Sequence, residues 1–204
     1  INEWIKRLKN PVIRKKVLQE MLTPTDKWEN LLLNAGDPNN VLLLGFTNDS
    51  LKRYTGKTLG EVAKIYGKSP QETAMDLVIA DKGQTACIIS IMAEADVRAA
   101  LVHPLVSIDT DSGARAEDGP LSESRSHPRA WGSATRILGT YVRDEKLLPL
   151  EEAVRKMTSL PASRMRFGDR GIVRPGMAAD LVAFDPLTVR SRATFADPLH
   201  YSEG

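Results

Sequence analysis

Two carboxylates, Asp109 and Asp111, stand one residue apart directly after the apolar residues 105–108. A chain with an ordinary charge balance seldom ends a buried strand on acid, so both side chains are candidates for chemistry. An ionised carboxylate can accept a proton from water and later return it to a leaving group. The alternative is that both acids only end a strand and cap the turn after it.

The other polar side chains that could take part in catalysis or binding are few and scattered. His127 and Arg129 flank Pro128, and a guanidinium at such a position can bond both oxygens of a carboxylate at once. The three histidines of the chain form no His-x-His pair, whereas zinc needs three or four protein ligands. Cys87 lies in an apolar run and is interpreted as a small buried side chain. The sequence therefore predicts no complete metal site in this chain.

Alternating apolar runs and helical patterns must position these residues. Fully apolar strands are expected at residues 41–46, 86–91 and 105–108. Helices are expected after the Asn10-Pro11 and Ser69-Pro70 starts and at residues 58–66, 94–101, 131–142 and 150–160. Strands that are apolar on both faces and separated by helices indicate parallel βαβ units. Three strands are fewer than the eight of a closed barrel, which favours a piece of a barrel over a small open sheet.

From Gly168 onward the residue pattern changes from alternating strands and helices to short strands joined by a turn. Residues 169–186 have the pattern of a short strand, a Pro175-Gly176 turn and a second strand. Two strands cannot bury a sheet face by themselves, so this hairpin is expected to join strands from elsewhere.

Composition excludes several classes of partner. Lys and Arg number 28 against 26 Asp and Glu, with the signs interspersed, so neither nucleic acid nor an anionic membrane is predicted. No apolar run reaches the roughly 18 residues of a membrane span, and no signal-peptide pattern is present. The single Cys87 rules out an intrachain disulfide and favours a cytoplasmic location.

Two blocks of the sequence carry a family resemblance. The pattern Gly171-Ile172, Gly176 and Ala179-Asp180-Leu181-Val182 resembles the C-terminal hairpin of the amidohydrolase superfamily. Residues 119–129 and 150–162 are similar to the N-acyl-D-amino-acid deacylases of that superfamily. The resemblance covers essentially the whole chain and corresponds to the C-terminal portion of the family. It implies an α/β fold in which residues 1–165 form the C-terminal part of a (β/α)8 TIM barrel and residues 166–204 belong to a small β-sandwich.

The resemblance also implies roles for single residues. Asp111 matches the aspartate that approaches the metal centre and moves the proton, and Arg129 matches the arginine that grips the substrate carboxylate. His127 and Thr47 are expected near the substrate. The family usually has Gly-Ser-Asp-Gly where this chain has Asp109-Thr110-Asp111-Ser112, so a second charge is added and two glycines are lost. Zinc is expected to be bound mostly by residues outside this chain.

The resemblance thus implies a zinc-dependent enzyme that hydrolyses N-acyl-D-amino acids. This chain would supply the acid/base and the carboxylate clamp, and an N-terminal part of the same enzyme or another chain would complete the site. Two alternatives remain open: a ring-opening amidohydrolase similar to dihydropyrimidinase or dihydroorotase, and a non-catalytic α/β interaction module. An incomplete barrel would expose apolar strand edges, whereas an interaction module would unfold cooperatively as a monomer.

Overall fold

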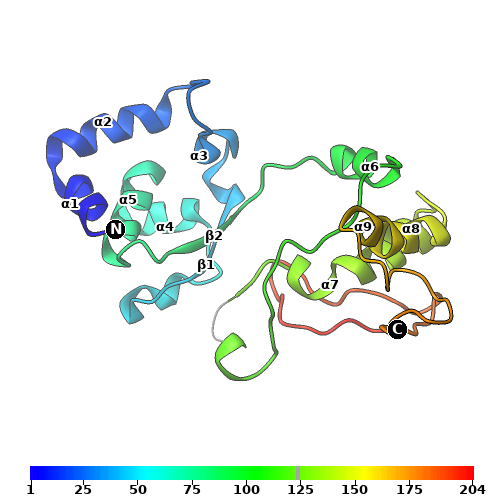
Figure 1. Cartoon of the computed structure of the whole chain (residues 1–204). Helices are drawn as coiled ribbons and strands as arrows, with labels where there is room; N and C mark the ends of the chain where they lie inside the picture. Colours follow the sequence, from blue (N-terminus) through cyan, green and yellow to red (C-terminus); the bar gives the residue numbers. More distant parts are fainter. Residues whose placement is uncertain (123–124) are drawn as a thin grey trace. The chain divides into compact units, whose positions relative to one another are not determined.

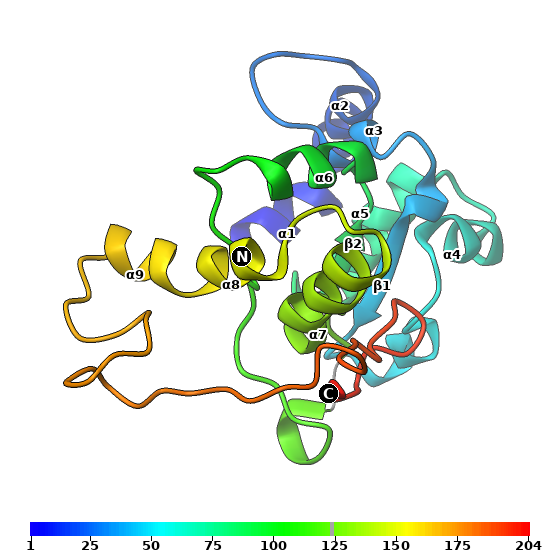
Figure 2. The same ribbon diagram turned by 90° about the vertical axis from the view of Figure 1, so that its right-hand side faces the viewer.

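The computed structural model describes residues 1–122 and 125–204 (Figure 1). The chain forms two compact units, Ile1–Ile91 and Met92–Gly204, which are described separately below. Figure 2 shows the helices of each unit from a second side. The predicted boundary between residues 165 and 166 lies inside the second unit and stays a prediction.

The first unit combines helices with a two-stranded sheet. Its elements are α1 (Asn2–Lys9), α2 (Pro11–Leu22), α3 (Leu31–Asn34), the 3-10 turn η1 (Pro38–Asn40), β1 (Val41–Gly45), η2 (Asp49–Tyr54), α4 (Leu59–Tyr66), α5 (Pro70–Ala80) and β2 (Ala86–Ile89).

Local capping explains where the main helices of this unit begin. The Asn10 side chain accepts hydrogen bonds from the first turn of α2, as the Asn-Pro start predicted. Ser69 and Glu72 form the predicted capping box of α5, in which the Glu72 N–H donates to Ser69 Oγ over 3.2 Å. Thr58 and Glu61 form a second capping box on α4. These helix starts are confirmed.

The predicted parallel pairing of the first two strands is wrong. β1 and β2 pair antiparallel, with Val41 opposite Ile89 and an irregularity between Leu43 and Gly45. The reason lies in the connection, which holds two helices, α4 and α5. One crossover helix returns the chain to the start of the sheet, but a second helix carries it back again, so β2 runs the opposite way. Cys87 on β2 is exposed, not buried as expected.

The core of the first unit lies between the sheet and its helices. Side chains from β1, η2, α4 and α5 are buried together, and this cluster comprises Ala35, Val41, Leu43, Phe46, Leu51, Tyr54, Leu59, Val62 and Leu77. Burial of this apolar surface holds α4 and α5 on the sheet, because each fully buried aliphatic side chain contributes roughly 1.5–3 kcal/mol.

The second unit contains helices and long irregular segments. Its elements are α6 (Glu94–Val102), the 3-10 turn η3 (Gly119–Ser122), α7 (Arg129–Arg136), the π-helix η4 (Ile137–Asp144), α8 (Leu150–Met157) and α9 (Ser159–Arg164). Its core comprises Leu101, Ile137, Leu138, Tyr141, Leu148, Ala153 and Val189. The two long helices that the sequence predicted are each divided, the first where α7 passes into η4 and the second at Thr158 (φ −128°, ψ −86°).

Two predicted strand regions of this unit do not form strands. Residues 105–108 are not a strand, and their backbone bonds α8 in place of a neighbouring strand, with the Val106 carbonyl accepting from the Lys156 side chain and the Ile108 N–H donating to the Lys156 carbonyl. In residues 169–186 only the Pro175-Gly176 turn is formed, with the Met177 N–H donating to the Arg174 carbonyl over 3.1 Å. A turn depends on local residues, but a hairpin needs further strands to cover it, and here Val173 and Val182 are exposed.

Candidate active site

Asp111 and Arg129 meet in the second unit. Asp111 Oδ2 lies 2.7 Å from Arg129 Nη2, and the Asp111 side chain is 83 % exposed. Asp111 has a positive φ of +45°, a conformation that Asp adopts more readily than most residues with a side chain. The two positions are 18 apart in the sequence (129 − 111), so their contact comes from the fold. The ion pair brings together the two residues with the strongest predicted roles.

Helix α7 positions the guanidinium, because Arg129 is its first residue. The Arg129 side chain is 44 % exposed. A guanidinium presents five N–H donors in a planar fork that can bind both oxygens of a carboxylate, and in the structure one of its nitrogens pairs with Asp111. An exposed ion pair contributes about 0–1 kcal/mol to stability, so this contact has little structural weight and can be exchanged for a ligand.

His127 organises the start of α7. Its Nδ1 accepts a hydrogen bond from the Arg129 N–H over 3.0 Å, and its ring meets Phe195 edge-on at 5.0 Å between centroids. Burial, and then the positive charge of Arg129, lower the pKa of His127 below its usual range. A neutral ring with Nδ1 as acceptor carries its proton on Nε2. The structure therefore gives His127 a capping contact beside Arg129, and its substrate-binding role stays a prediction.

Asp109 differs from its neighbour in its contacts. Its Oδ1 accepts a hydrogen bond from the Thr110 N–H over 2.7 Å, a contact to the next residue along the chain. Asp109 thus makes the kind of local contact that a capping role predicts, although residues 105–108 form no strand for it to end, whereas Asp111 has a partner far away in the sequence.

Thr47 belongs to the first unit. Its hydroxyl and its N–H both donate to Asp81 Oδ1 over 2.9 Å, and the Asn48 N–H donates to the same oxygen over 2.7 Å. The structure does not join Thr47 to Asp111, Arg129 and His127, and its predicted contact with substrate stays a prediction.

The described residues do not fit a zinc ion by themselves. In residues 1–122 and 125–204 no three His, Cys, Asp or Glu side chains are grouped so that they could hold a metal. Asp111, which was expected beside the metal, has Arg129 as its partner, and a guanidinium is not a ligand. No catalytic step is therefore assigned to a metal held by these residues alone.

Sequence reasoning missed two buried charged residues. Asp81 is 1 % exposed and holds the loop after β1, and Lys156 on α8 is fully buried. A signal for Lys156 exists, because it lies three residues after the buried Ala153 and so on the same face of the helix. Nothing in the sequence around Asp81 separates it from an ordinary helix end.

No helix in the described part of the chain combines the length and the apolar character that a membrane crossing requires.

Comparison with known sequences gives one family. The amidohydrolase family matches residues 55–203. An N-acyl-D-aspartate deacylase from Alcaligenes xylosoxydans xylosoxydans is 37 % identical over 150 residues, and a D-aminoacylase from the same organism is 40 % identical over 150 residues. Each match covers 74 % of this chain and 28 % of the relative. The chain thus spans less than a third of the length of these relatives.

Solved structures give the same similarity. An N-acyl-D-glutamate deacylase from Bordetella bronchiseptica, complexed with zinc and a phosphonate inhibitor, superposes with a TM-score of 0.72 and 34 % identity over 84 % of this chain and 33 % of that chain. A crystal structure of D-aminoacylase has a TM-score of 0.69 and 37 % identity over 80 % of this chain and 32 % of that chain. A further D-aminoacylase structure with a TM-score of 0.68 addresses a binuclear metal centre.

Proposed function

The chain belongs to the amidohydrolase family, and we propose that it forms part of a zinc-dependent enzyme that hydrolyses N-acyl-D-amino acids. The observation that supports this proposal is the ion pair between Asp111 and Arg129, a carboxylate and a guanidinium with the chemistry that the proposed proton transfer and substrate binding require. The relatives named for N-acyl-D-amino acids and the phosphonate-bound structure support the substrate class.

In the proposed reaction Arg129 binds the α-carboxylate of the substrate through two parallel hydrogen bonds. Asp111 takes a proton from the water whose oxygen attacks the acyl carbon. When the C–N bond breaks, Asp111 returns this proton to the leaving nitrogen. The products are a carboxylic acid and a D-amino acid. Because Asp111 and Arg129 pair with each other in the structure, the substrate carboxylate competes with Asp111 for the guanidinium and frees it for proton transfer.

The zinc ligands in this proposal come from residues outside this chain, since the described residues group no set of three. They belong to an N-terminal part of the same enzyme or to another chain. The proposal includes the C-terminal part of a TIM barrel and a β-sandwich that contains residues 166–204. A cytoplasmic location also belongs to it, because Cys87 has no second cysteine to pair with.

A chimeric enzyme tests this function. Residues 55–203 would replace the matching segment of the Alcaligenes D-aminoacylase, and the chimera would be assayed with zinc on N-acetyl-D-amino acids and on a cyclic ureide. We expect turnover of the N-acyl-D-amino acids. Asp111→Asn should lower kcat about 10²- to 10⁴-fold, whereas the matched variant Asp109→Asn should change it less than about tenfold.

Arg129→Lys gives an independent readout in the same chimera. A lysine keeps the charge but loses the fork, so KM should rise about 10- to 100-fold with a smaller change in kcat. Near-normal kcat in Asp111→Asn would remove Asp111 from the reaction. A folded chimera that turned over only the ureide would favour a ring-opening amidohydrolase, and one without any turnover would favour an interaction module.

A further inference from the structure

Lys156 is a buried cation that the proposed reaction does not use. Its side chain is 0 % exposed, and it lies near the C-terminal end of α8. Its ammonium donates to the carbonyl of His103 and, over 3.0 Å, to the carbonyl of Val106. Glu152 Oε1, one turn earlier on the same helix, lies 3.8 Å away. The ammonium therefore binds the segment before Asp109 and Asp111.

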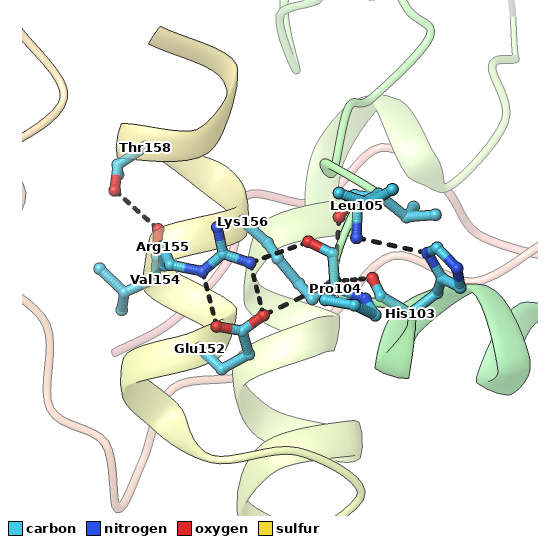
Figure 3. Close-up of polar contacts among 9 residues, drawn as sticks. His103, Pro104, Leu105, Glu152, Val154, Arg155, Lys156 and Thr158 are labelled. Atoms are coloured by element: carbon cyan, nitrogen blue, oxygen red, sulfur yellow. Dashed lines mark hydrogen bonds and ion pairs between the residues drawn. The ribbon is translucent and has the colours of Figure 1, made fainter. Parts of the chain in front are cut away.

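Two more contacts join this segment to the end of α8. The Ile108 N–H donates to the Lys156 carbonyl over 3.1 Å, and Arg155 Nη2 donates to the Pro104 carbonyl over 2.9 Å. Figure 3 shows Arg155 and Lys156 reaching from α8 toward His103 and Pro104, with Glu152 beside them. We call Arg155 and Lys156 the α8 clamp. Together they bind the backbone of residues 103, 104, 106 and 108.

Lys156 has a structural role that an apolar side chain could not fill. An apolar side chain of similar volume usually replaces a buried charged group at no loss of stability when the surrounding polar groups are also removed. Here the acceptors are backbone carbonyls, which no side-chain change can remove, and although the His103 carbonyl also accepts from the Val106 N–H, the Val106 carbonyl takes its donor from Lys156. Glu152 also pairs with Arg155 over 2.7 Å, which holds the exposed arm of the clamp in place.

The clamp ends three residues before Asp111. The last bonded group is the Ile108 N–H, and residues 109–111 then turn so that Asp111 reaches Arg129. These residues have no strand neighbour in the structure, so the clamp, together with the packing of Ile108 against the core of the second unit, fixes the start of this segment. An error of about 1 Å in the position of a catalytic group can lower a rate about 100-fold.

We propose that the α8 clamp, with Lys156 as its buried member, is a positioning device that sets the place of Asp111 by holding residues 103–108 on α8. This inference rests on the proposed function for its effect on rate, but its structural part concerns this chain alone. Lys156 contacts neither substrate nor the reacting atoms in this scheme, and acts through Asp111.

Hydrogen exchange of the 204-residue chain tests the structural part. Lys156→Met keeps the length of the side chain but removes the donors, and Lys146→Met removes an exposed ammonium of the same unit as a control. We expect the backbone amides of residues 105–111 to exchange about tenfold faster or more in Lys156→Met, since two hydrogen bonds are lost. Amides of residues 137–141 in the core should keep their wild-type rates in both variants.

Kinetics of the chimera test the effect on rate. Lys156→Met should lower kcat about 10- to 100-fold and leave KM near the wild-type value, because Arg129 is untouched. Lys156→Arg keeps a cation with donors and should retain more of kcat than Lys156→Met. A simple loss of stability would instead lower the folded fraction and leave the kcat of the folded enzyme unchanged.

Each outcome decides. Unchanged exchange at residues 105–111, or equally faster exchange throughout the unit, overturns the positioning role. If Lys156→Met does not fold, Arg155→Met is measured in its place. We then expect the amides of residues 104–108 to exchange about threefold faster, and unchanged exchange would overturn the clamp. A wild-type chimera without turnover rejects the proposed function, whereas the exchange result still decides the role of the clamp.

Discussion

Asp109 and Asp111 carry the same functional group but have different partners. Asp109 accepts a hydrogen bond from the adjacent Thr110 N–H, whereas Asp111 pairs with Arg129 at the start of α7. The distinction matters because Asp109 bonds the backbone of the residue next to it. A carboxylate paired with an exposed cation, such as Asp111, can instead exchange its partner when a charged ligand binds. The pairing of Asp111 is thus the contact that a substrate carboxylate would alter.

At the residue scale, His127 should make stability depend on pH. Its pKa is lowered in the folded chain by burial and by Arg129, so below its unfolded value of 6.5 the unfolded state binds more protons than the folded state. Stability must then rise with pH across this region and level off once the ring is neutral in both states. The carboxyls with lowered pKa, such as Asp76 and Glu152, act in the same direction but titrate at more acidic pH.

Urea unfolding at pH 5, 6 and 7 measures this dependence. His127→Asn keeps an acceptor for the Arg129 N–H but has no ionisable ring, so the rise in the free energy of unfolding between pH 5 and 7 should be smaller than in the wild type. Its absolute stability should also fall, because the contact with Phe195 is lost. Equal pH dependence in both proteins would contradict a lowered pKa for His127.

At the element scale, Asp81 holds the segment after β1. Its Oδ1 accepts three hydrogen bonds from Thr47 and Asn48, and its Oδ2 accepts one from Thr85 over 3.2 Å. Asp81→Ala would leave the part-buried N–H groups of Thr47 and Asn48 without this acceptor, so we expect a loss of about 1–3 kcal/mol in the free energy of unfolding. Thr47→Val removes one of these bonds and should cost about 1 kcal/mol.

Asp49→Ala is the matched control for Asp81→Ala. Asp49 lies in η2 with its side chain 90 % exposed, and its Oδ1 lies 2.8 Å from Nζ of Lys52, three residues later in the sequence. An exposed pair of this kind contributes about 0–1 kcal/mol, so the control should change stability very little. Equal effects of the two substitutions in urea unfolding would show that Asp81 does not anchor the segment.

Elements were predictable from the sequence where local contacts decide them. The caps at Asn10 and Ser69 use side chains within three residues of the helix start, and both helices begin as predicted. The direction of β2 was not predictable in this way, because it depends on how the two predicted helices of the connection pack on the sheet and on what covers each face. The same holds for residues 105–108, where the backbone of Val106 and Ile108 bonds Lys156, about 50 residues away.

The candidate site shows the same limit. Asp111 and Arg129 could be selected by residue type and pattern, but their contact could not be derived from spacing, since they are 18 positions apart and come together only through the fold of the chain between them. Lys156 was missed because lysine is rarely buried, and only the three-residue step from Ala153 reveals its face. Long-range polar contacts thus account for most of what the sequence did not predict.

At the scale of the whole molecule, two cores divide the chain. One surrounds Leu43 and Val62 in the first unit, and the other surrounds Leu138 and Ala153 in the second. Asp111, Arg129 and the α8 clamp all lie in the second unit, whereas Thr47 lies in the first. The relatives are more than three times as long as the region they share with this chain.

Metal content separates a self-sufficient site from a shared one. The 204-residue chain, purified with zinc and dialysed without chelator, should retain well below one zinc per chain, because a stable site needs three or four protein ligands and the described residues group no three. Chelator should then leave its unfolding midpoint unchanged, since a metal that is not bound cannot add to stability. The active chimera should instead hold about one or two zinc ions and lose turnover when they are removed.

Elemental analysis of both proteins, prepared side by side, gives the comparison. Stoichiometric zinc in the chain alone, with a midpoint that falls on chelation, would mean that its own side chains assemble a site. Asp111→Asn in the chain would then show whether Asp111 belongs to it, because loss of a ligand lowers the retained zinc while loss of a proton acceptor does not. Zinc in the chimera but not in the chain would place the ligands outside residues 55–203 and leave Asp111 and Arg129 as the contribution of this chain to a shared site.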